Sequence, residues 1–187
     1  MCSSIWKWRS ASRRRPHPRA NGGRRVPSHV LHHHYGDRSG VWRWTLVGFV
    51  AGAASVLLFH QGAFALLHAL DLTARAPYST QPTSPWGIPQ IWSITLWGGV
   101  WGVLLAATLA RLEGRRLTLG ALVFGAILPT LVAWFVVAPL KGQPMAGGLV
   151  PMAMAVGLIV NGAWGVGTGL GLALFGRSNR PDKAAQR

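Results

Sequence analysis

Three polar side chains interrupt long apolar stretches of this 187-residue chain: His60, Gln61 and Asn161. His60 and Gln61 lie near the middle of one apolar stretch, and Asn161 lies near the middle of another. A polar side chain at the centre of a bilayer is costly, so such residues are functional candidates. Imidazole exchanges protons near neutral pH. Together the three side chains could bind a polar ligand or relay a proton.

A functional role requires these side chains to meet inside the protein. We expect them in the interior of a helix bundle, walled by three tryptophans, Trp97, Trp101 and Trp164. The alternative is structural, because polar side chains on neighbouring membrane helices also hydrogen-bond to one another, at ~0.6 kcal/mol on average. The sequence leaves both interpretations open.

Other kinds of site have less support. His68 and Asp71 lie near the end of the first apolar stretch, where an interfacial role is expected. The histidines at 29 and 32–34 have no carboxylates or thiols beside them, so we expect no specific metal site. The apolar stretches contain no acidic residue, and the chain has no nucleophile motif. We therefore expect no cofactor and no enzymatic activity.

Long uncharged stretches define the elements that must position these residues. Only 12% of the residues are charged, about half the usual share for soluble proteins. Four apolar stretches each exceed the ~20 residues that a helix needs to cross a bilayer. They cover residues 45–70, 89–110, 117–140 and 149–175. The sequence predicts an all-α, polytopic membrane protein with four transmembrane helices within residues 42–176.

The distribution of basic residues predicts how these helices are oriented. Seventeen of the nineteen Lys and Arg residues lie before residue 45, between the second and third helices, or after residue 175. Only Arg75 and Lys141 lie in the other two connections. Because Lys and Arg near membrane ends are retained in the cytoplasm, both termini should be cytoplasmic. We expect a multi-pass protein of the bacterial inner membrane.

Residues 1–41 form a basic arm with little apolar material. We expect this arm to be disordered, because it cannot bury enough surface to offset its ordering entropy. It could attract anionic lipid headgroups, or it could be a solvated tail or untranslated upstream sequence. Nucleic-acid binding is an unlikely use of the same charge. Residues 177–187 should form a short cytoplasmic tail.

One pattern of residues occurs twice. Ala76-Pro77-x-x-x-Gln81-Pro82 returns 62 residues later as Ala138-Pro139-x-x-x-Gln143-Pro144. Gly99-x-Trp101-Gly102-Val103 returns 63 residues later as Gly162-x-Trp164-Gly165-Val166. The pattern favours a duplicated helical hairpin. Because four helices return the chain to its starting side, the two hairpin repeats would be parallel. The first and third helices show little similarity.

Small residues four apart predict where the helices touch. Such residues permit close backbone approach in lipid. The second and fourth helices carry them at matching positions, which include Gly98, Gly102, Gly165 and Gly169. The leading functional expectation is a non-enzymatic accessory or scaffold subunit that packs against other membrane proteins or forms homo-oligomers. The alternative is a small oligomeric permease or channel that uses His60, Gln61 and Asn161.

Overall fold

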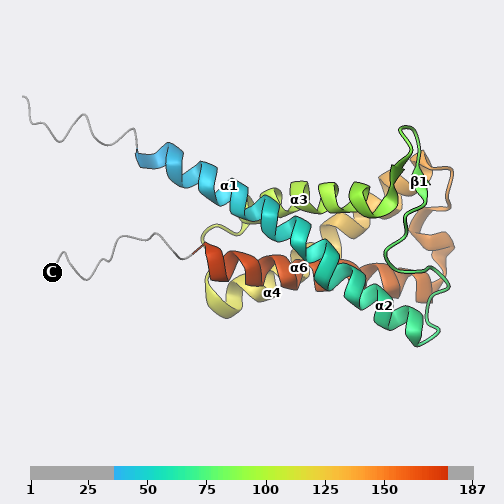
Figure 1. Cartoon of the computed structure of the whole chain (residues 1–187). Helices are drawn as coiled ribbons and strands as arrows, with labels where there is room; N and C mark the ends of the chain where they lie inside the picture. Colours follow the sequence, from blue (N-terminus) through green and yellow to red (C-terminus); the bar gives the residue numbers. More distant parts are fainter. Residues whose placement is uncertain (1–35, 177–187) are drawn as a thin grey trace, which may run out of the picture. The chain divides into compact units, whose positions relative to one another are not determined.

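The computed structural model describes residues 36–176, which form a bundle of long helices (Figure 1). Four helical spans are long and apolar enough to cross a membrane, namely Trp42–Ala69, Gln90–Thr108, Gly114–Leu140 and Pro151–Phe175. The described chain is thus mostly helical, and the prediction of four helices long and apolar enough to span a membrane is confirmed. Residues 1–35, which include most of the basic arm, and the tail 177–187 lie outside the described residues.

Two of the spans consist of several helical segments. The first consists of α1 (Gly36–Ser55) from Trp42 onward, the π-helical turn η2 (Val56–His60) and α2 (Gln61–Ala69). The third contains α4 (Gly114–Val132), the π-helical turn η3 (Ala133–Val137) and α5 (Ala138–Leu140). The second and fourth are the single helices α3 (Gln90–Thr108) and α6 (Pro151–Phe175). The connections contain the paired strands β1 (Pro82–Thr83) and β2 (Ile88–Pro89) and the 3-10 turn η4 (Met145–Leu149).

The first helix begins earlier than the sequence predicts. α1 starts at Gly36, so residues 36–41, which were expected to belong to a disordered arm, have a helical backbone. Polar residues can extend a helix beyond its apolar stretch because the backbone hydrogen bonds continue, and only proline removes a donor. No proline occurs between Pro27 and Pro77. The membrane-spanning part of this helix begins at Trp42, and most of the predicted arm lies outside the described residues.

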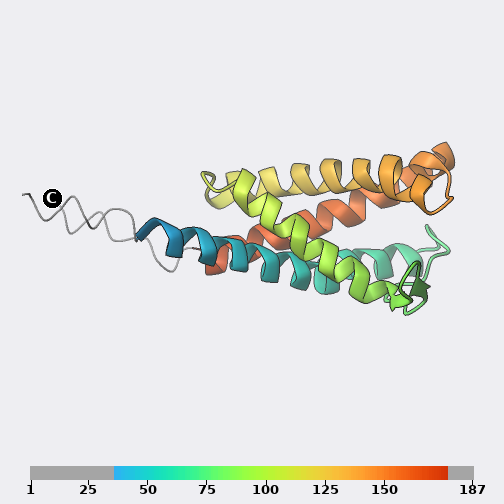
Figure 2. The same cartoon turned by 90° about the horizontal axis from the view of Figure 1, so that it is seen from above.

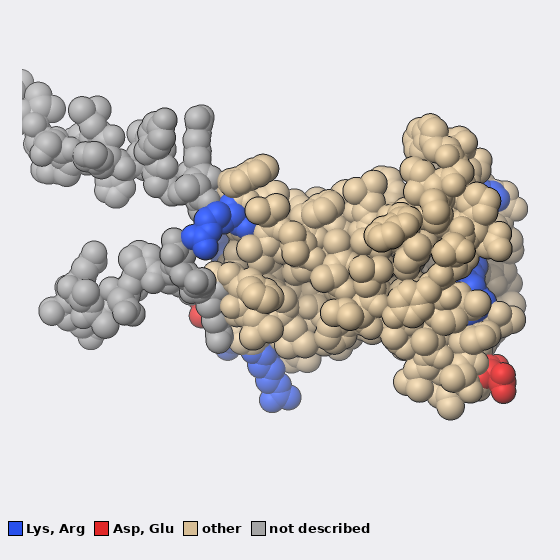
Figure 3. All heavy atoms as spheres, in the orientation of Figure 1, with Lys and Arg blue, Asp and Glu red and all other residues tan. Residues whose placement is uncertain are grey.

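Successive spans run in opposite directions (Figures 1 and 2). The end of the bundle that holds the start of α1, the α3–α4 turn and the end of α6 is here called the terminal end. The loop end holds the connections 70–89 and 141–150. In Figure 3, the Lys, Arg, Asp and Glu side chains lie at these two ends, with an uncharged surface between them. This distribution fits a protein that crosses a membrane.

The helices of each hairpin touch at glycine. α1 packs along α3, and α4 packs along α6. A Cβ atom added to Gly52 would lie 2.9 Å from the Cα of Gly102, and one added to Gly125 would lie 2.8 Å from the Cα of Gly165. Both distances are too short for a real Cβ, so the backbones approach as closely as only glycine allows. α1 and α6 then pack together and join the hairpins.

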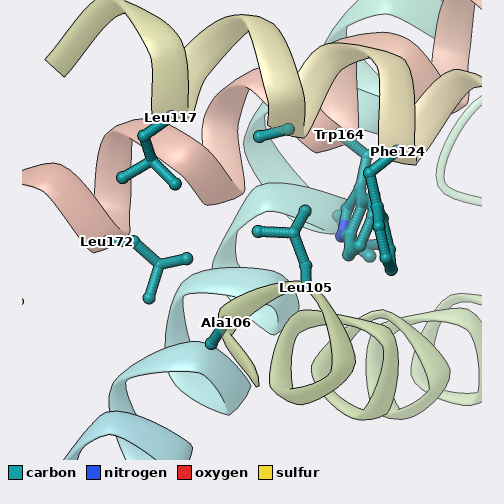
Figure 4. Packing of buried hydrophobic residues seen from close by; sticks show 8 residues of the cluster. Leu105, Ala106, Leu117, Phe124, Trp164 and Leu172 are labelled. Atoms are coloured by element: carbon teal, nitrogen blue, oxygen red, sulfur yellow. The ribbon is translucent and has the colours of Figure 1, made fainter. Parts of the chain in front are cut away.

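A hydrophobic cluster connects all four spans. Leu105 of α3 and Leu172 of α6 are fully buried, and Leu117 of α4 lies with them. Figure 4 shows these three leucine side chains directed into the same space. A second cluster lies nearer the loop end, where Phe64 and Leu67 of α2 pack against Val156 and Val160 of α6. Side-chain packing therefore ties α6 to the whole length of the first span.

The two connections at the loop end differ in structure although the Ala-Pro-x-x-x-Gln-Pro pattern occurs near both. Each preceding helix ends with a left-handed residue, Asp71 (φ 56°) or Gly142 (φ 64°), followed by the backbone hydrogen bonds of a Schellman motif. Ala76-Pro77 lies beyond the first helix end, whereas Ala138-Pro139 lies inside α5. The repeated Ala-Pro letters therefore do not occupy equivalent places. The first connection is the longer one and holds the β1–β2 pair.

Candidate functional site

Gln61 joins the first span to the connection that follows it. The backbone N–H of Tyr78 donates to Gln61 Oε1 at 2.6 Å, and the Tyr78 hydroxyl donates to the carbonyl oxygen of Leu57 at 2.9 Å. Gln61 is 5% exposed. Tyr78 has a left-handed φ of 52°, which turns its backbone N–H and its side chain toward the helix. The connection is thus attached to the span at the π-helical turn η2.

These bonds determine the orientation of the neighbouring His60 ring. A backbone N–H can only donate, so Gln61 Oε1 faces Tyr78 and the amide Nε2 faces His60 Nδ1, at 3.3 Å. Nε2 of Gln61 can only donate, so Nδ1 of His60 accepts and the neutral ring carries its proton on the other nitrogen. The ring stacks on Phe64 with centroids 6.2 Å apart. His60 therefore presents its Nε2–H as a donor.

Asn161 belongs to a different hydrogen-bonded pair. Its Nδ2 donates to the hydroxyl oxygen of Thr130 on α4 at 2.9 Å, and that hydroxyl donates to the carbonyl of Gly157 at 3.4 Å. Thr130 is 1% exposed. It directly follows Pro129, which lies inside α4. The pair links the two helices of the second hairpin at the level of this proline.

Trp164 joins α6 to α1. Its indole N–H donates to the carbonyl oxygen of Gly52 at 2.9 Å. Its own carbonyl accepts from the hydroxyls of Ser55 at 2.7 Å and of Thr168 at 2.9 Å. The side chain is 2% exposed and lies beside Phe124 in Figure 4. Trp164 therefore holds the two central helices together through both its side chain and its backbone.

The predicted polar site is thus divided between different neighbours. Gln61 is bonded to His60 and to the first connection, whereas Asn161 is bonded to Thr130 of α4. The three tryptophans are divided as well. Trp164 is buried, and Trp97 is 60% exposed. Trp101 is half-buried and forms a T-shaped pair with Phe124, with the ring centroids 6.1 Å apart. Trp97 faces outward and does not wall an interior site.

The two residues expected at an interface lie where the first span ends. His68 Nδ1 is 2.9 Å from the carbonyl oxygen of Thr73, so the ring bridges the end of α2 and the start of the connection. Asp71 is exposed and is the left-handed residue that ends the helix. Both residues lie at the loop end of the first span, and the bond of His68 supports the end of this helix.

The predicted packing glycines contact other helices of the same chain. Cβ atoms built on Gly98, Gly102, Gly165 and Gly169 would meet atoms of α1, α4 or α6. The other described membrane-spanning glycines also have neighbours within 4 Å of a built Cβ, except Gly62 and Gly114, the first residue of the third span. A homo-oligomer or a partner protein would therefore have to contact surfaces other than these glycine stripes.

Two participants were not identified from the sequence as parts of this network: Tyr78 and Thr130. Tyr78 lies seventeen residues from Gln61, in a connection whose path no periodic pattern predicts. Hydroxyl side chains in helices are common and usually bond to their own backbone, so Thr130 carried no distinctive signal. The proximity of Thr130 to Pro129 was the only sign that its surroundings are unusual.

Removing the Tyr78 hydroxyl should loosen the first connection. We expect Tyr78→Phe to lower the free energy of unfolding by about 1 kcal/mol, because the Leu57 carbonyl loses its donor while the ring is kept. Amide hydrogen exchange of residues 76–81 should accelerate. Thr80→Val, on the exposed side of the same connection, is the matched control and should change neither quantity. Unaltered exchange in Tyr78→Phe would show that the connection is held by other contacts.

Within residues 36–176, no group of three or more His, Cys, Asp or Glu side chains is arranged to hold a metal ion. Every buried side-chain nitrogen or oxygen in this part of the chain has a hydrogen-bond partner. Comparison of the chain with protein-family models, with curated proteins and with solved structures gave no match.

Proposed function

We propose that this protein is a non-enzymatic accessory or scaffold subunit of a membrane protein complex. It would lie in the bacterial inner membrane with both termini in the cytoplasm, where seventeen of its nineteen basic residues would then be. The basic arm would lie against anionic headgroups of that side. In this role the four helices form a rigid body, and their lipid-facing surface binds the partner.

The observation that carries this proposal is the use of polar groups inside the bundle. Every buried polar side chain in residues 36–176 is bonded within the chain, and the bonds of Trp164, Thr130 and Gln61 join separate elements. A transport path needs polar groups that can release one partner for another. Groups engaged in holding helices together are better suited to a scaffold.

The surface that best fits a partner is the side of α3 opposite α1. Trp92, Leu96 and Val100 follow one another at four-residue spacing, and they are 61%, 56% and 38% exposed. Tryptophan is enriched at positions that dominate binding energy, and it offers a large rigid surface. In a membrane-spanning helix this strip would pack against a helix of a different membrane protein.

We also propose that the two hairpins arose by duplication, in a register that differs between helices. α3 and α6 would correspond at an offset of 63 residues, which is the spacing of the Gly-x-Trp-Gly-Val pattern that both contain. α1 and α4 would correspond at 73 residues, because Gly52 meets Gly102 in the same way as Gly125 meets Gly165. The difference of ten residues equals the extra length of the first connection. The duplication would supply two similar parallel hairpins as a scaffold.

His60 supports the alternative, a small oligomeric permease or channel. It is only half-buried, and only one of its ring nitrogens has a hydrogen-bond partner within residues 36–176. The ring lies in a π-helical turn, a feature often found at functional sites. In this alternative, His60 and Gln61 would line a path shared between copies of the chain, and Asn161 would lie on the same path.

Site-specific crosslinking distinguishes these functions. A photoreactive residue at position 96, in native membranes, should form an adduct with one protein other than this chain. The same residue at position 58, where Leu58 is 69% exposed on the first span, is the matched control and should give no such adduct. Adducts between copies of this chain alone, at either position, would contradict the accessory role and favour the permease.

A further inference from the structure

The first connection folds back along the first span instead of extending away from it. The Tyr78 hydroxyl donates to the carbonyl oxygen of Leu57, and the Tyr78 N–H donates to Gln61. Leu57 lies twelve residues, or about 18 Å of helix, before the end of α2 at Ala69. Part of the connection therefore lies beside a segment of the candidate membrane span Trp42–Ala69.

The same part of the connection touches the start of the second span. The Ile91 N–H donates to the carbonyl oxygen of Ser79 at 3.0 Å, and the Gln90 N–H donates to the carbonyl oxygen of Gln81 at 2.9 Å. Gln90 is the first residue of α3, and the nineteen residues of this helix cover about 28 Å. This length is close to the ~30 Å of a hydrocarbon core. When α3 crosses the membrane, residues 78–81 therefore lie where the hydrocarbon core ends at the loop end.

The rest of the connection is a short hairpin that presents an exposed tryptophan. β1 and β2 pair antiparallel, and the Thr83 hydroxyl donates to the carbonyl oxygen of Ile88 at 2.7 Å. The turn is closed by the Gly87 N–H, which donates to the carbonyl oxygen of Thr83 at 2.8 Å. Trp86, in this turn, is 82% exposed, and Ile88 is 43% exposed. Figure 1 shows the hairpin extending to the side of the bundle, next to the start of α3. The hairpin thus holds Trp86 outside the core.

The composition of this connection suits the headgroup layer of a membrane. Residues 76–89 contain no Lys, Arg, Asp or Glu. Four of these fourteen residues are prolines, which have no N–H group that needs a partner. The N–H groups of Tyr78 and Gly87 are bonded within the chain. A segment that leaves water must satisfy its backbone polar groups, so these features lower the cost of entering the interface. Tryptophan and tyrosine are enriched there because their rings are partly apolar and partly polar.

We propose that the β1–β2 hairpin inserts Trp86 into the lipid headgroup layer on the loop side of the membrane. Because Tyr78 is bonded to the first span and Gln81 to α3, the inserted hairpin holds the loop ends of both spans at a fixed depth. Gln61, which binds Tyr78, then lies near this membrane surface and not at the centre of the bilayer. This anchor is independent of the accessory role, since lipid surrounds the bundle with or without a partner protein.

Spin-label accessibility of the full-length protein in liposomes of phosphatidylethanolamine and phosphatidylglycerol tests this placement. Cys2, the only cysteine, is replaced by serine, and one label is attached through Ser84→Cys or Ala74→Cys, both at exposed positions. The measured quantity is the ratio of collisions with membrane-soluble oxygen to collisions with a water-soluble nickel chelate. This ratio should be higher at position 84, beside Trp86, than at position 74, beside Arg75. Equal ratios would overturn the proposal.

Replacement of the ring tests whether Trp86 holds the hairpin in the headgroup layer. Trp86→Ser in the Ser84→Cys protein should lower the ratio toward that of position 74, with an unchanged circular dichroism spectrum because the ring is exposed. Thr80→Ser, at another exposed position of the connection, is the matched control and should leave the ratio unchanged. A ratio that does not respond to Trp86→Ser would overturn the proposal. A label at position 84 that is shielded from both reagents in native membranes, but not in liposomes, would assign the hairpin to a partner protein and also overturn it.

Discussion

Adding one methyl group at Gly102 should destabilise the bundle much more than the same change at Gly62, another membrane-spanning glycine. A Cβ at this position would collide with the carbonyl oxygen of Gly48 and lie 2.9 Å from the Cα of Gly52. Backbone atoms of a packed helix cannot move aside as a side chain can. We expect Gly102→Ala to lower the free energy of unfolding by about 1–3 kcal/mol, the range for overpacked sites.

Gly62 provides the matched control for this substitution. It lies in a membrane-spanning helix, but nothing lies within 4 Å of a Cβ built there. Because alanine favours helix over glycine by ~1 kcal/mol in water, Gly62→Ala should be neutral or stabilising. The measurement is thermal unfolding of the purified variants in one detergent. Equal stability of Gly102→Ala and Gly62→Ala would contradict the close approach of α1 and α3.

The second large effect should come from Trp164. Replacing it with alanine removes a buried ring and the N–H bond to Gly52. We expect Trp164→Ala to cost about 3 kcal/mol, the lower end of the range for such truncations, because lipid rather than water solvates separated membrane helices. Trp164→Phe keeps most of the packing and should cost about 1 kcal/mol, the contribution of one hydrogen bond.

Trp92→Ala is the control that separates the effect of removing Trp164 from the effect of removing any tryptophan. Its side chain is 61% exposed on α3, so Trp92→Ala should leave the stability of the purified protein within about 0.5 kcal/mol of wild type. Thermal unfolding in detergent gives both values. A Trp164→Ala protein as stable as Trp92→Ala would show that the contact between α6 and α1 does not hold the bundle together.

The fold could be predicted from apolar length, and the helix contacts from small residues. A chain segment in the membrane must hydrogen-bond its own backbone N–H and C=O groups, and a helix does this. The four long uncharged stretches were therefore expected to be helices. Gly98, Gly102, Gly165 and Gly169 were expected at contacts, and each lies at one. The start of α1 was missed because the polar residues before residue 42 carry no apolar pattern, although they can continue a helix.

The arrangement of the polar residues could not be predicted in the same way. His60 and Asn161 are both near the middle of apolar stretches, but the rotation of each helix and the nearby hydroxyls decide their partners. Asn161 is bonded to Thr130, and Gln61 is bonded to Tyr78 in a connection that has no periodic signal. Trp97 and Trp164 illustrate the same limit, since the same residue type is exposed on α3 and buried on α6.

The repeated sequence patterns correspond only in part to equivalent positions in the two hairpins. The Gly-x-Trp-Gly-Val strings lie in α3 and α6, but Ala76-Pro77 and Ala138-Pro139 lie in a connection and a helix respectively. Proline and glutamine at loop positions can match by composition alone, whereas a contact between two glycine backbones needs a defined geometry. The contacts of Gly52 and Gly125 therefore give the more informative register.

Composition of the native complex tests the accessory role most directly. The protein is purified from its own membrane in a mild detergent, and the mass and subunits of the intact particle are measured. The account predicts a stoichiometric second membrane protein that remains bound through size exclusion. A homogeneous particle that contains only copies of this chain would contradict it and leave the permease, with His60 and Gln61 on its path, as the better explanation.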